Sequence, residues 1–325
     1  MMLPWTLRIL TGPLRPFLVR KLLHAVRERV LVRGARGRFP SAPNEARGLR
    51  MGLVPLPGAA WMAQHGQDVL DFAERMRSGR VNAFGITSWT VGAPDPENVD
   101  VRGVHELSRM HHWCAYALAA HCDPDRRDVW CATLADEVRT FIASYPPEHG
   151  THWAFPMGTG IRLHSLLVAW DWARQTGWSD PDADRRVAAT AVDHARSVYA
   201  RREERGGLST SHFAANCIGL LAAGRYVTGE AEAERWHRVA TDALERELLR
   251  QILADGMANE GSTGYHRQVV DTFVHAGTLM SYSPQAGARL ARAVEQLLRL
   301  ERFGMPLIGD NDDGLTMKLT GFAPD

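Results

Sequence analysis

Hydrophobic residues recur along most of the chain with the period of about 3.6 residues that is typical of amphipathic α-helices. The pattern predicts helices over residues 13–32, 66–78, 103–121, 127–144, 160–175, 184–202, 211–224, 232–253, 263–281 and 286–302. Turn-forming pairs such as Asp180-Pro181 and Ser283-Pro284 separate successive segments. Strand-like patterns are confined to two short, ambiguous runs at 51–55 and 305–309. The sequence therefore predicts an all-α protein.

The connections between successive helices are short, which favours antiparallel neighbours. Helix pairs that follow one another every ~40–50 residues indicate either an open α-solenoid or an α/α toroid. No tetratricopeptide or ankyrin consensus is present, so any repeat is structural only. A ring of helix hairpins has a concave mouth that suits an elongated ligand.

Composition and charge exclude several other classes of protein. Of the 325 residues, 45% are hydrophobic and 23% are charged, which is ordinary for a globular chain and unlike a disordered one. The net charge of +1 gives no overall attraction to nucleic acid, so we expect no nucleic-acid partner. The four cysteines show no C-x-x-C spacing and are expected to be reduced thiols.

The charge is unevenly distributed along the chain. Residues 1–50 carry a net charge of +9, whereas the remainder carries −8. We interpret 1–50 as a basic N-terminal helical arm, which either contacts a membrane surface or partner protein or packs on the body with its charged face in solvent. No apolar run reaches the ~18 residues that span a bilayer, and no signal sequence is recognisable. These features predict a cytoplasmic protein.

The densest cluster of candidate chemistry lies at residues 255–267. Ser262 is placed to cap a helix, and Tyr265, His266 and Arg267 would then occupy its first turn. The positive end of the helix dipole favours an anion there, including the ionised form of tyrosine, whose reference pKa is ~10. Tyr265 also shares a helix face with apolar residues one and two turns later, so core packing is the alternative.

Two further clusters contain histidine. Thr210-Ser211-His212 opens an apolar helix, which by itself is a weak signal. Residues 105–112 begin like the zinc-binding H-E-x-x-H motif, but Arg109 occupies the position of the second histidine. Glu106 and Arg109 fall on one helix face, where they either form a structural ion pair or hold a polar ligand. A calcium-like loop at 310–314 has its glycine one position early. We expect no metal ion and no cofactor.

Taken together, the motifs resemble the heparinase II/III-like polysaccharide lyases. The matching segments are His105-Glu106-Leu107-Ser108-Arg109 (family W-E-L-N-R), Gly150-Thr151-His152-Trp153 (G-x-N-W), Ile161-Arg162 (A-I-R), Thr210-Ser211-His212 (N-N-H), Asp255 to His266 (D-G-x-x-x-E-x-S-x-x-Y-H) and Pro306 to Asp312 (P-x-I-G-D-x-D). Their order and spacing agree with the family over residues 80–318. The resemblance implies an N-terminal α/α toroid followed by an antiparallel β-domain.

The resemblance also implies a reaction and a set of residues. Family members cleave acidic polysaccharides such as glycosaminoglycans or alginate by β-elimination beside a uronic acid. Tyr265 would be the acid/base, His212 would neutralise the uronate or act as a second base, and Ser211 stands where the family has asparagine. His266 would support them. The residues expected to bind substrate are Arg267, Glu106, Arg109, Trp153, Arg162 and Glu260, with Trp153 stacking on a sugar ring.

The expected architecture is an incomplete (α/α) toroid built of antiparallel helix hairpins. It spans residues 51–318, and 319–325 begin a linker toward a C-terminal β-domain that is missing from the chain. The leading hypothesis is a polysaccharide lyase that binds an acidic polysaccharide or oligosaccharide. The alternatives are a carbohydrate-binding or scaffold module, or a truncated fragment, without activity. A toroid hydrolase using Asp255 and Glu260 would need the two carboxyl groups about 5–9.5 Å apart across a sugar.

Overall fold

The computed structural model describes residues 47–204, 210–310 and 314–322. The predicted helix at 13–32 and most of the basic arm lie outside these ranges. The helices are α3 (Ala59–Arg77), α4 (Val101–Leu107), α5 (His112–Cys122), α6 (Arg127–Ser144), α7 (Pro156–Gln175), α8 (Pro181–Ala200), α9 (Ser211–Tyr226), α10 (Ala233–Gln251), α11 (Thr263–Gly277) and α12 (Pro284–Arg302), with short 3₁₀ helices at Pro124–Arg126 and Thr151–Trp153.

Within the described ranges, the strands form two small antiparallel pairs. Strand β1 (Gly48–Leu49) pairs with β4 (Val227–Thr228), and β2 (Arg80–Ala83) pairs with β3 (Ile86–Ser88). The fold is therefore all-α in class, as the hydrophobic period predicts.

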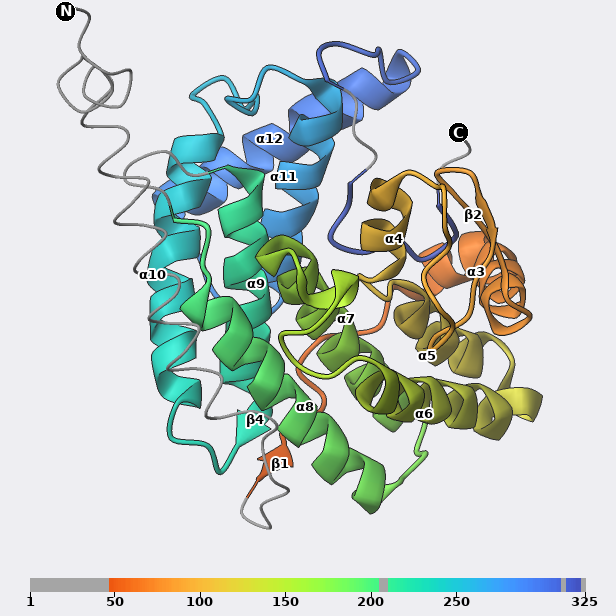
Figure 1. The fold of residues 1–325 in the computed structure, drawn as a ribbon. Coiled ribbons are helices and arrows are strands. Elements are labelled where there is room, and N and C mark those ends of the chain that lie inside the picture. Colours follow the sequence, from red (N-terminus) through yellow and green to blue (C-terminus); the bar gives the residue numbers. More distant parts are fainter. Residues whose placement is uncertain (1–46, 205–209, 311–313, 323–325) are drawn as a thin grey trace, which may run out of the picture.

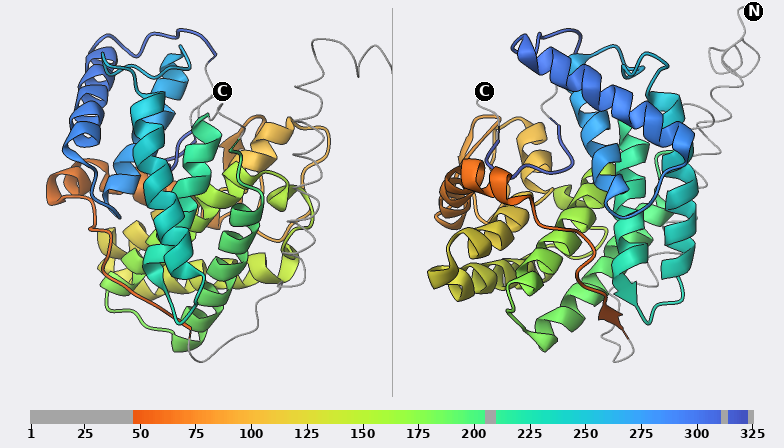
Figure 2. Two further views of the ribbon diagram at one scale, coloured as in Figure 1. Left: turned by 90° about the vertical axis from the view of Figure 1, so that its left-hand side faces the viewer. Right: turned by 180° about the vertical axis from the view of Figure 1, so that it is seen from behind.

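The helices form two layers that follow an arc (Figures 1 and 2). Helices α5, α7, α9 and α11 contact one another in that order and make the inner layer. Helices α6, α8, α10 and α12 each pack on the preceding or following inner helix from outside. This arrangement is the predicted incomplete (α/α) toroid of antiparallel hairpins.

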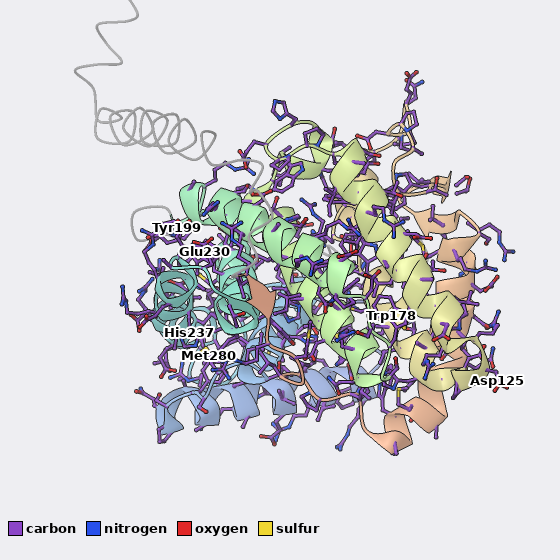
Figure 3. The ribbon with its side chains drawn as sticks, turned by 90° about the horizontal axis from the view of Figure 1, so that it is seen from below. Asp125, Trp178, Tyr199, Glu230, His237 and Met280 are labelled. Atoms are coloured by element: carbon purple, nitrogen blue, oxygen red, sulfur yellow. The ribbon has the colours of Figure 1, made fainter. Side chains whose placement is uncertain are left out.

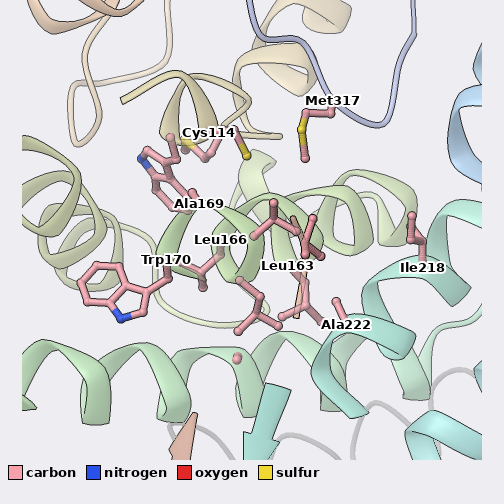
Figure 4. Close-up of a cluster of buried hydrophobic side chains, with 14 of the residues drawn as sticks. Cys114, Leu163, Leu166, Ala169, Trp170, Ile218, Ala222 and Met317 are labelled. Atoms are coloured by element: carbon pink, nitrogen blue, oxygen red, sulfur yellow. The ribbon is translucent and has the colours of Figure 1, made fainter. Parts of the chain in front are cut away.

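The two layers differ in the composition of their helices. Inner helices α5 and α7 are buried along almost their whole length, whereas α10 and α12 bury one face and expose a charged one. In Figure 4, Leu163 and Leu166 of α7 lie between Cys114 of α5 and Ala222 of α9. The core thus runs continuously through the inner layer.

Helices α7 and α9 approach each other at a pair of glycines. A Cβ added at Gly160 would lie 2.5 Å from the carbonyl oxygen of Ala215, and one added at Gly219 would lie 2.5 Å from that of Gly160. Such distances are shorter than any ordinary contact, so only glycine permits the two backbones to pack here.

Several helices start at a capping side chain, including the predicted cap Ser262 and residues of the predicted turn pairs. The side chains of Asp180, Ser283 and Ser262 accept backbone N–H groups at the starts of α8, α12 and α11. Proline occupies the first turn of both α8 and α12. Local sequence therefore sets these boundaries.

The predicted single helix at 103–121 is wrong. The chain leaves the helix after Leu107, adopts a positive φ of 55° at Met110 and begins α5 at His112. One reason lies outside the segment, because Arg162 donates to the carbonyl of Ser108 at 2.8 Å. His112 therefore belongs to α5, where its Nε2 lies 2.8 Å from a carboxylate oxygen of Glu137.

Neither of the two ambiguous runs forms a strand. In the run at 51–55, the backbone N–H groups of Gly52, Leu53 and Val54 donate to the carboxylate of Asp171 instead of to a neighbouring strand. This carboxylate also accepts the hydroxyl of Tyr226 at 2.8 Å. One buried aspartate therefore anchors the chain before α3 to the inner layer.

Residues 314–322, which we call the closing segment, join the two ends of the arc. The segment passes between α11–α12 and α3–α4 (Figures 1 and 2). Thr316 bonds to Thr272 of α11 through their hydroxyls at 2.7 Å, and Phe322 packs edge-on against Phe72 of α3 at 5.6 Å between ring centroids. The beginning of the predicted linker 319–325 thus packs on the toroid.

Figure 3 shows the molecule from below, with Glu230 and Tyr199 labelled close together. Glu230 pairs with Arg47 at 2.7 Å and with Arg196 at 3.4 Å, and the guanidinium of Arg202 lies 3.9 Å from the ring centre of Tyr199.

In the part of the chain that the structure describes, no helix combines the length and the apolar character needed to cross a membrane.

Candidate active site

A cavity of about 240 Å³ opens where α4, α7, α9 and α11 meet. The residues that line it are Phe84, Val101, Arg102, His105, Glu106, Ser108, Arg109, Thr151, His152, Phe155, Met157, Gly158, His212, Tyr265 and Gln268. Four predicted site residues are among them: Glu106, Arg109, His212 and Tyr265. Segments separated by more than 150 positions in sequence thus meet at one concave surface.

Tyr265 occupies the first turn of α11 and is partly buried. Its backbone N–H donates to the capping hydroxyl of Ser262 at 3.2 Å. The start of this helix is held from the other side, because the N–H of Thr263 donates to the carbonyl of Ile308 at 3.0 Å. The phenol is therefore presented to the cavity by a fixed backbone at the positive end of a helix dipole.

His212 faces the same cavity from the first turn of α9. Its Nδ1 lies 3.0 Å from a carboxylate oxygen of Glu203. This hydrogen bond raises the pKa of His212, against the opposing effects of burial and of Arg109. Asn216 holds Glu203 in turn, because its amide oxygen accepts the backbone N–H of Glu203 at 2.8 Å. His212 is thus more readily cationic than an ordinary histidine.

Glu106 is the centre of a buried charge cluster beneath the cavity. Its carboxylate pairs with Arg109, with His111 at 3.3 Å and with Lys318 at 2.9 Å. Burial alone would raise the pKa of Glu106, but the three cationic or polar partners hold it well below its ordinary value. Burial lowers the pKa of His111 to about 4, so this imidazole is neutral near pH 7. Of the three partners of Glu106, Arg109 is the one that lines the cavity.

An aromatic edge borders the charged wall. Phe155 is 49% exposed, and its ring meets that of His105 edge-on at 4.3 Å between centroids. Burial and the nearby charge of Arg109 lower the pKa of His105. Burial also lowers the pKa of His152, another lining residue, to about 4. Two lining imidazoles therefore favour the neutral form, whereas His212 favours the charged form.

Trp153 and Arg162 do not reach the cavity, contrary to the sequence-based expectation. Trp153 is 2% exposed, and its ring lies 4.5 Å from that of His194 and 5.1 Å from the Arg162 guanidinium. No face of this ring is open to a sugar. Arg162 is fully buried and donates to the carbonyls of Ser108 and His152 at 2.8 and 2.9 Å. Arg162 thus fixes the backbone of two lining residues from behind.

The remaining predicted residues surround the site without lining it. His266 is buried, and its Nδ1 accepts the backbone N–H of Ala258 at 3.2 Å, which ties the preceding loop to α11. Ser211 is buried, and its backbone N–H donates to Glu260 at 3.0 Å, so Glu260 supplements the N-cap Thr210 at the start of α9. Arg267 is partly buried on another face of α11.

Two further possibilities find no support in the described residues. Asp255 is exposed, its carboxylate accepts the N–H of Met257, and neither it nor Glu260 lines the cavity. A paired-carboxylate hydrolase site is therefore not formed by these residues. No group of three or more histidine, cysteine, aspartate or glutamate side chains is placed to hold a metal ion within the described ranges.

Sequence reasoning missed several residues of the site. Glu203 lies nine positions before His212 in the sequence, and Lys318 is more than 200 positions from Glu106. His105 belongs to a recognised motif but was not among the expected site residues, and Phe155 lies two positions after the motif residue Trp153, so the neighbouring motifs were the signal that could have found both. The two charged partners have no local signal.

Comparison with known proteins finds one matching family model and several structures of the same fold. The profile described as "Heparinase II/III N-terminus" matches residues 89–290, more than half of the chain. The crystal structure of heparinase III superposes with a TM-score of 0.56 at 15% identity, covering 89% of this chain and 46% of that one. Heparan sulfate lyase HepC from Pedobacter heparinus gives 0.52 at 16% identity, covering 86% and 43%.

These structural matches establish a shared fold. The chain spans less than half the length of either solved structure. No curated protein sequence matches the chain.

Proposed function

The chain belongs to the heparinase II/III family, and from this premise we propose that its cavity cleaves an acidic, uronic-acid-containing polysaccharide by β-elimination. The reaction removes a proton from the carbon beside the uronate carboxylate and protonates the leaving oxygen at C4. The carboxylate resists this step unless positive groups stabilise the charge that develops on it. The site must therefore supply a proton-transfer group and cationic donors at one sugar.

The observation that carries the proposal is that Tyr265, His212 and Arg109 line one cavity. In this proposal Tyr265, as a phenolate, takes the proton from the carbon beside the carboxylate, and a C4=C5 double bond forms as the C4–O bond breaks. The resulting phenol then returns the proton to the leaving oxygen. His212, with its pKa raised by Glu203, and Arg109 hold the uronate carboxylate. The raised pKa favours the role of His212 as a charge neutraliser over a role as second base. His266 and Arg162 support the site as positioning residues.

We also propose a division of labour along the chain. The toroid of residues 51–318 provides this cavity, and the linker beginning at 319 leads toward a β-domain of the kind that the family resemblance implies. Such a domain would complete the substrate cleft. A polymer such as a glycosaminoglycan or alginate is the proposed partner.

A carbohydrate-binding module without catalysis is the second candidate. The position that holds asparagine in the family motif is Ser211, whose buried hydroxyl does not line the cavity. An amide would offer two donor hydrogens to a uronate, whereas a hydroxyl offers one. This difference favours binding without efficient cleavage.

The direct test measures the near-ultraviolet absorbance of unsaturated uronate products. The 325-residue chain, alone and joined to any β-domain encoded after it, is incubated with heparan sulfate, other glycosaminoglycans and alginate. We expect absorbance to rise with at least one polymer. Calorimetric binding without any such product would instead support the binding module, and absence of both would reject the two candidates together.

The proposed charge on His212 predicts a shift in the pH dependence. A protonated His212 pairs with the substrate carboxylate, so KM should rise as pH increases through the pKa of His212. Glu203→Gln removes the hydrogen bond that raises this pKa, and the rise in KM should therefore move to lower pH. KM measured between about pH 5 and about pH 9 checks the shift.

Glu204→Gln is the matched control for this experiment. Glu204 is exposed, and its carboxylate pairs with Arg246 at 3.5 Å rather than with His212. Its pH profile should equal that of the wild type. Identical profiles for Glu203→Gln and wild type would contradict the assigned role of His212.

We place the sugar-stacking surface at Phe155 instead of Trp153. Phe155 lines the cavity and is half exposed, so a sugar face can cover its ring. Phe155→Ala should raise KM about three- to tenfold, the effect of one aromatic contact, with little change in kcat. Phe303→Ala, which removes an 84% exposed ring outside the cavity, should leave KM unchanged. An unchanged KM for Phe155→Ala would reject this surface.

A further inference from the structure

The closing segment brings a buried lysine against the wall of the cavity. Lys318 is 5% exposed, and its Nζ lies 2.9 Å from Oε1 of Glu106 and 5.4 Å from the ring centre of Phe322. A lysine is rarely buried unless it is paired, and the carboxylate of Glu106 provides such a partner here. Lys318 itself does not line the cavity.

Glu106 divides its carboxylate between the cavity side and the core side. Arg109 contacts Oε2, whereas Lys318 and His111 contact Oε1. Of these three partners, only Arg109 lines the cavity. The pKa of His111 is lowered to about 4, so near neutral pH the carboxylate is shared between two cations, Arg109 and Lys318.

We propose that Lys318 is a positioning residue that keeps the positive charge of Arg109 available to a substrate carboxylate or sulfate. The inference rests on the proposed function and adds to it the group that controls anion affinity. A single carboxylate cancels the charge of a single cation at close range. When Lys318 shares Glu106, part of the field of Arg109 is left uncompensated toward the cavity. Without Lys318, Glu106 and Arg109 form a closed, neutral pair.

Lys318 lies on the closing segment, which is attached to both ends of the arc. Its segment is attached to α11 through Thr316 and Thr272, and α11 carries Tyr265. The segment is attached to α3 through Phe322 and Phe72. Lys318 thus links Glu106 of α4, and through it Arg109, to a segment that contacts both ends of the arc.

The test compares Lys318→Met, Lys318→Arg and the double variant Lys318→Met/Glu106→Gln. Calorimetry at fixed salt measures affinity for a heparan sulfate tetrasaccharide and for an alginate tetrasaccharide, and steady-state assays give KM and kcat on the polymer. We expect Lys318→Met to weaken binding and raise KM about tenfold with kcat nearly unchanged. Lys318→Arg should bind like the wild type. The double variant should recover affinity, because the carboxylate that neutralises Arg109 is gone.

Glu106→Gln alone keeps the test decisive if Lys318→Met fails to fold. The proposal predicts that this variant binds the tetrasaccharide at least as tightly as the wild type, since Arg109 keeps its full charge. A purely structural role for the cluster predicts weaker binding, because Arg109 loses its anchor. Equal affinities of wild type and folded Lys318→Met, or weaker binding by Glu106→Gln, overturn this inference alone. Absence of binding by the wild-type chain overturns the proposed function and this inference with it.

Discussion

Replacing Tyr265 with phenylalanine is expected to lower kcat by about 10²–10⁴-fold, the usual contribution of a group that transfers a proton in the transition state. The ring remains, so the packing of α11 and the shape of the cavity are retained. His212, Arg109 and Phe155 still line the cavity to hold the sugar. Affinity for substrate should therefore stay within about twofold.

The measurement combines turnover from the absorbance assay with calorimetric affinity of the same protein. Tyr199→Phe is the matched control, because Tyr199 lies under the guanidinium of Arg202 and does not line the cavity. It should retain full turnover. If Tyr265→Phe keeps more than about a tenth of wild-type kcat, Tyr265 is not the acid/base, and its role is packing at the start of α11.

Replacing Arg162 with methionine is expected to lower the free energy of unfolding by at least about 3 kcal/mol. Methionine keeps much of the volume but donates no hydrogen bond. The carbonyls of Ser108 and His152 and the Nε2 of His194 would each lose the partner that Arg162 provides in a buried site. Each unsatisfied buried acceptor costs about 1–3 kcal/mol, and this substitution leaves three of them.

Chemical denaturation followed by circular dichroism measures this loss. Arg139→Met is the control, because Arg139 is more than half exposed and forms one surface ion pair with Asp136 at 2.6 Å. Its effect should remain within about 0.5 kcal/mol. A loss below about 1 kcal/mol for Arg162→Met would contradict the anchoring role.

The helical fold could be predicted from the sequence because its signals are local. Apolar period, capping residues and prolines act within a few positions, and α6 begins and ends at the residues that the pattern predicts. The break between α4 and α5 has no comparable signal. It depends on Met110 in a left-handed conformation and on Arg162 more than 50 positions away.

The site could be predicted only in part. The resemblance of motifs indicated Tyr265 and His212, and the structure brings both to one cavity. The same resemblance indicated Trp153, which the fold buries beneath Arg162, while Phe155 two positions later faces the cavity. Residue type and spacing do not determine which of two neighbouring rings is turned outward, because helix packing decides it.

Partners that meet across the ring had the weakest signal. Glu203 and Lys318 influence His212 and Arg109 through contacts that form only when the chain is folded. The hydrophobic pattern does not reveal these contacts. From the sequence alone, Glu203 and Lys318 are each equally consistent with a charged side chain exposed to solvent.

The glycine pair at Gly160 and Gly219 has a consequence for the proposed binding of a polymer. Helices α7 and α9, which carry Gly158 and His212, pack with their backbones in direct contact. This part of the cavity wall is therefore rigid. Enlargement for a bulkier sugar is therefore expected at lining residues outside the inner layer, such as Phe84 and Arg102. Selectivity among polymers in this lineage is expected to change by substitutions at those residues, with the helix spacing kept constant.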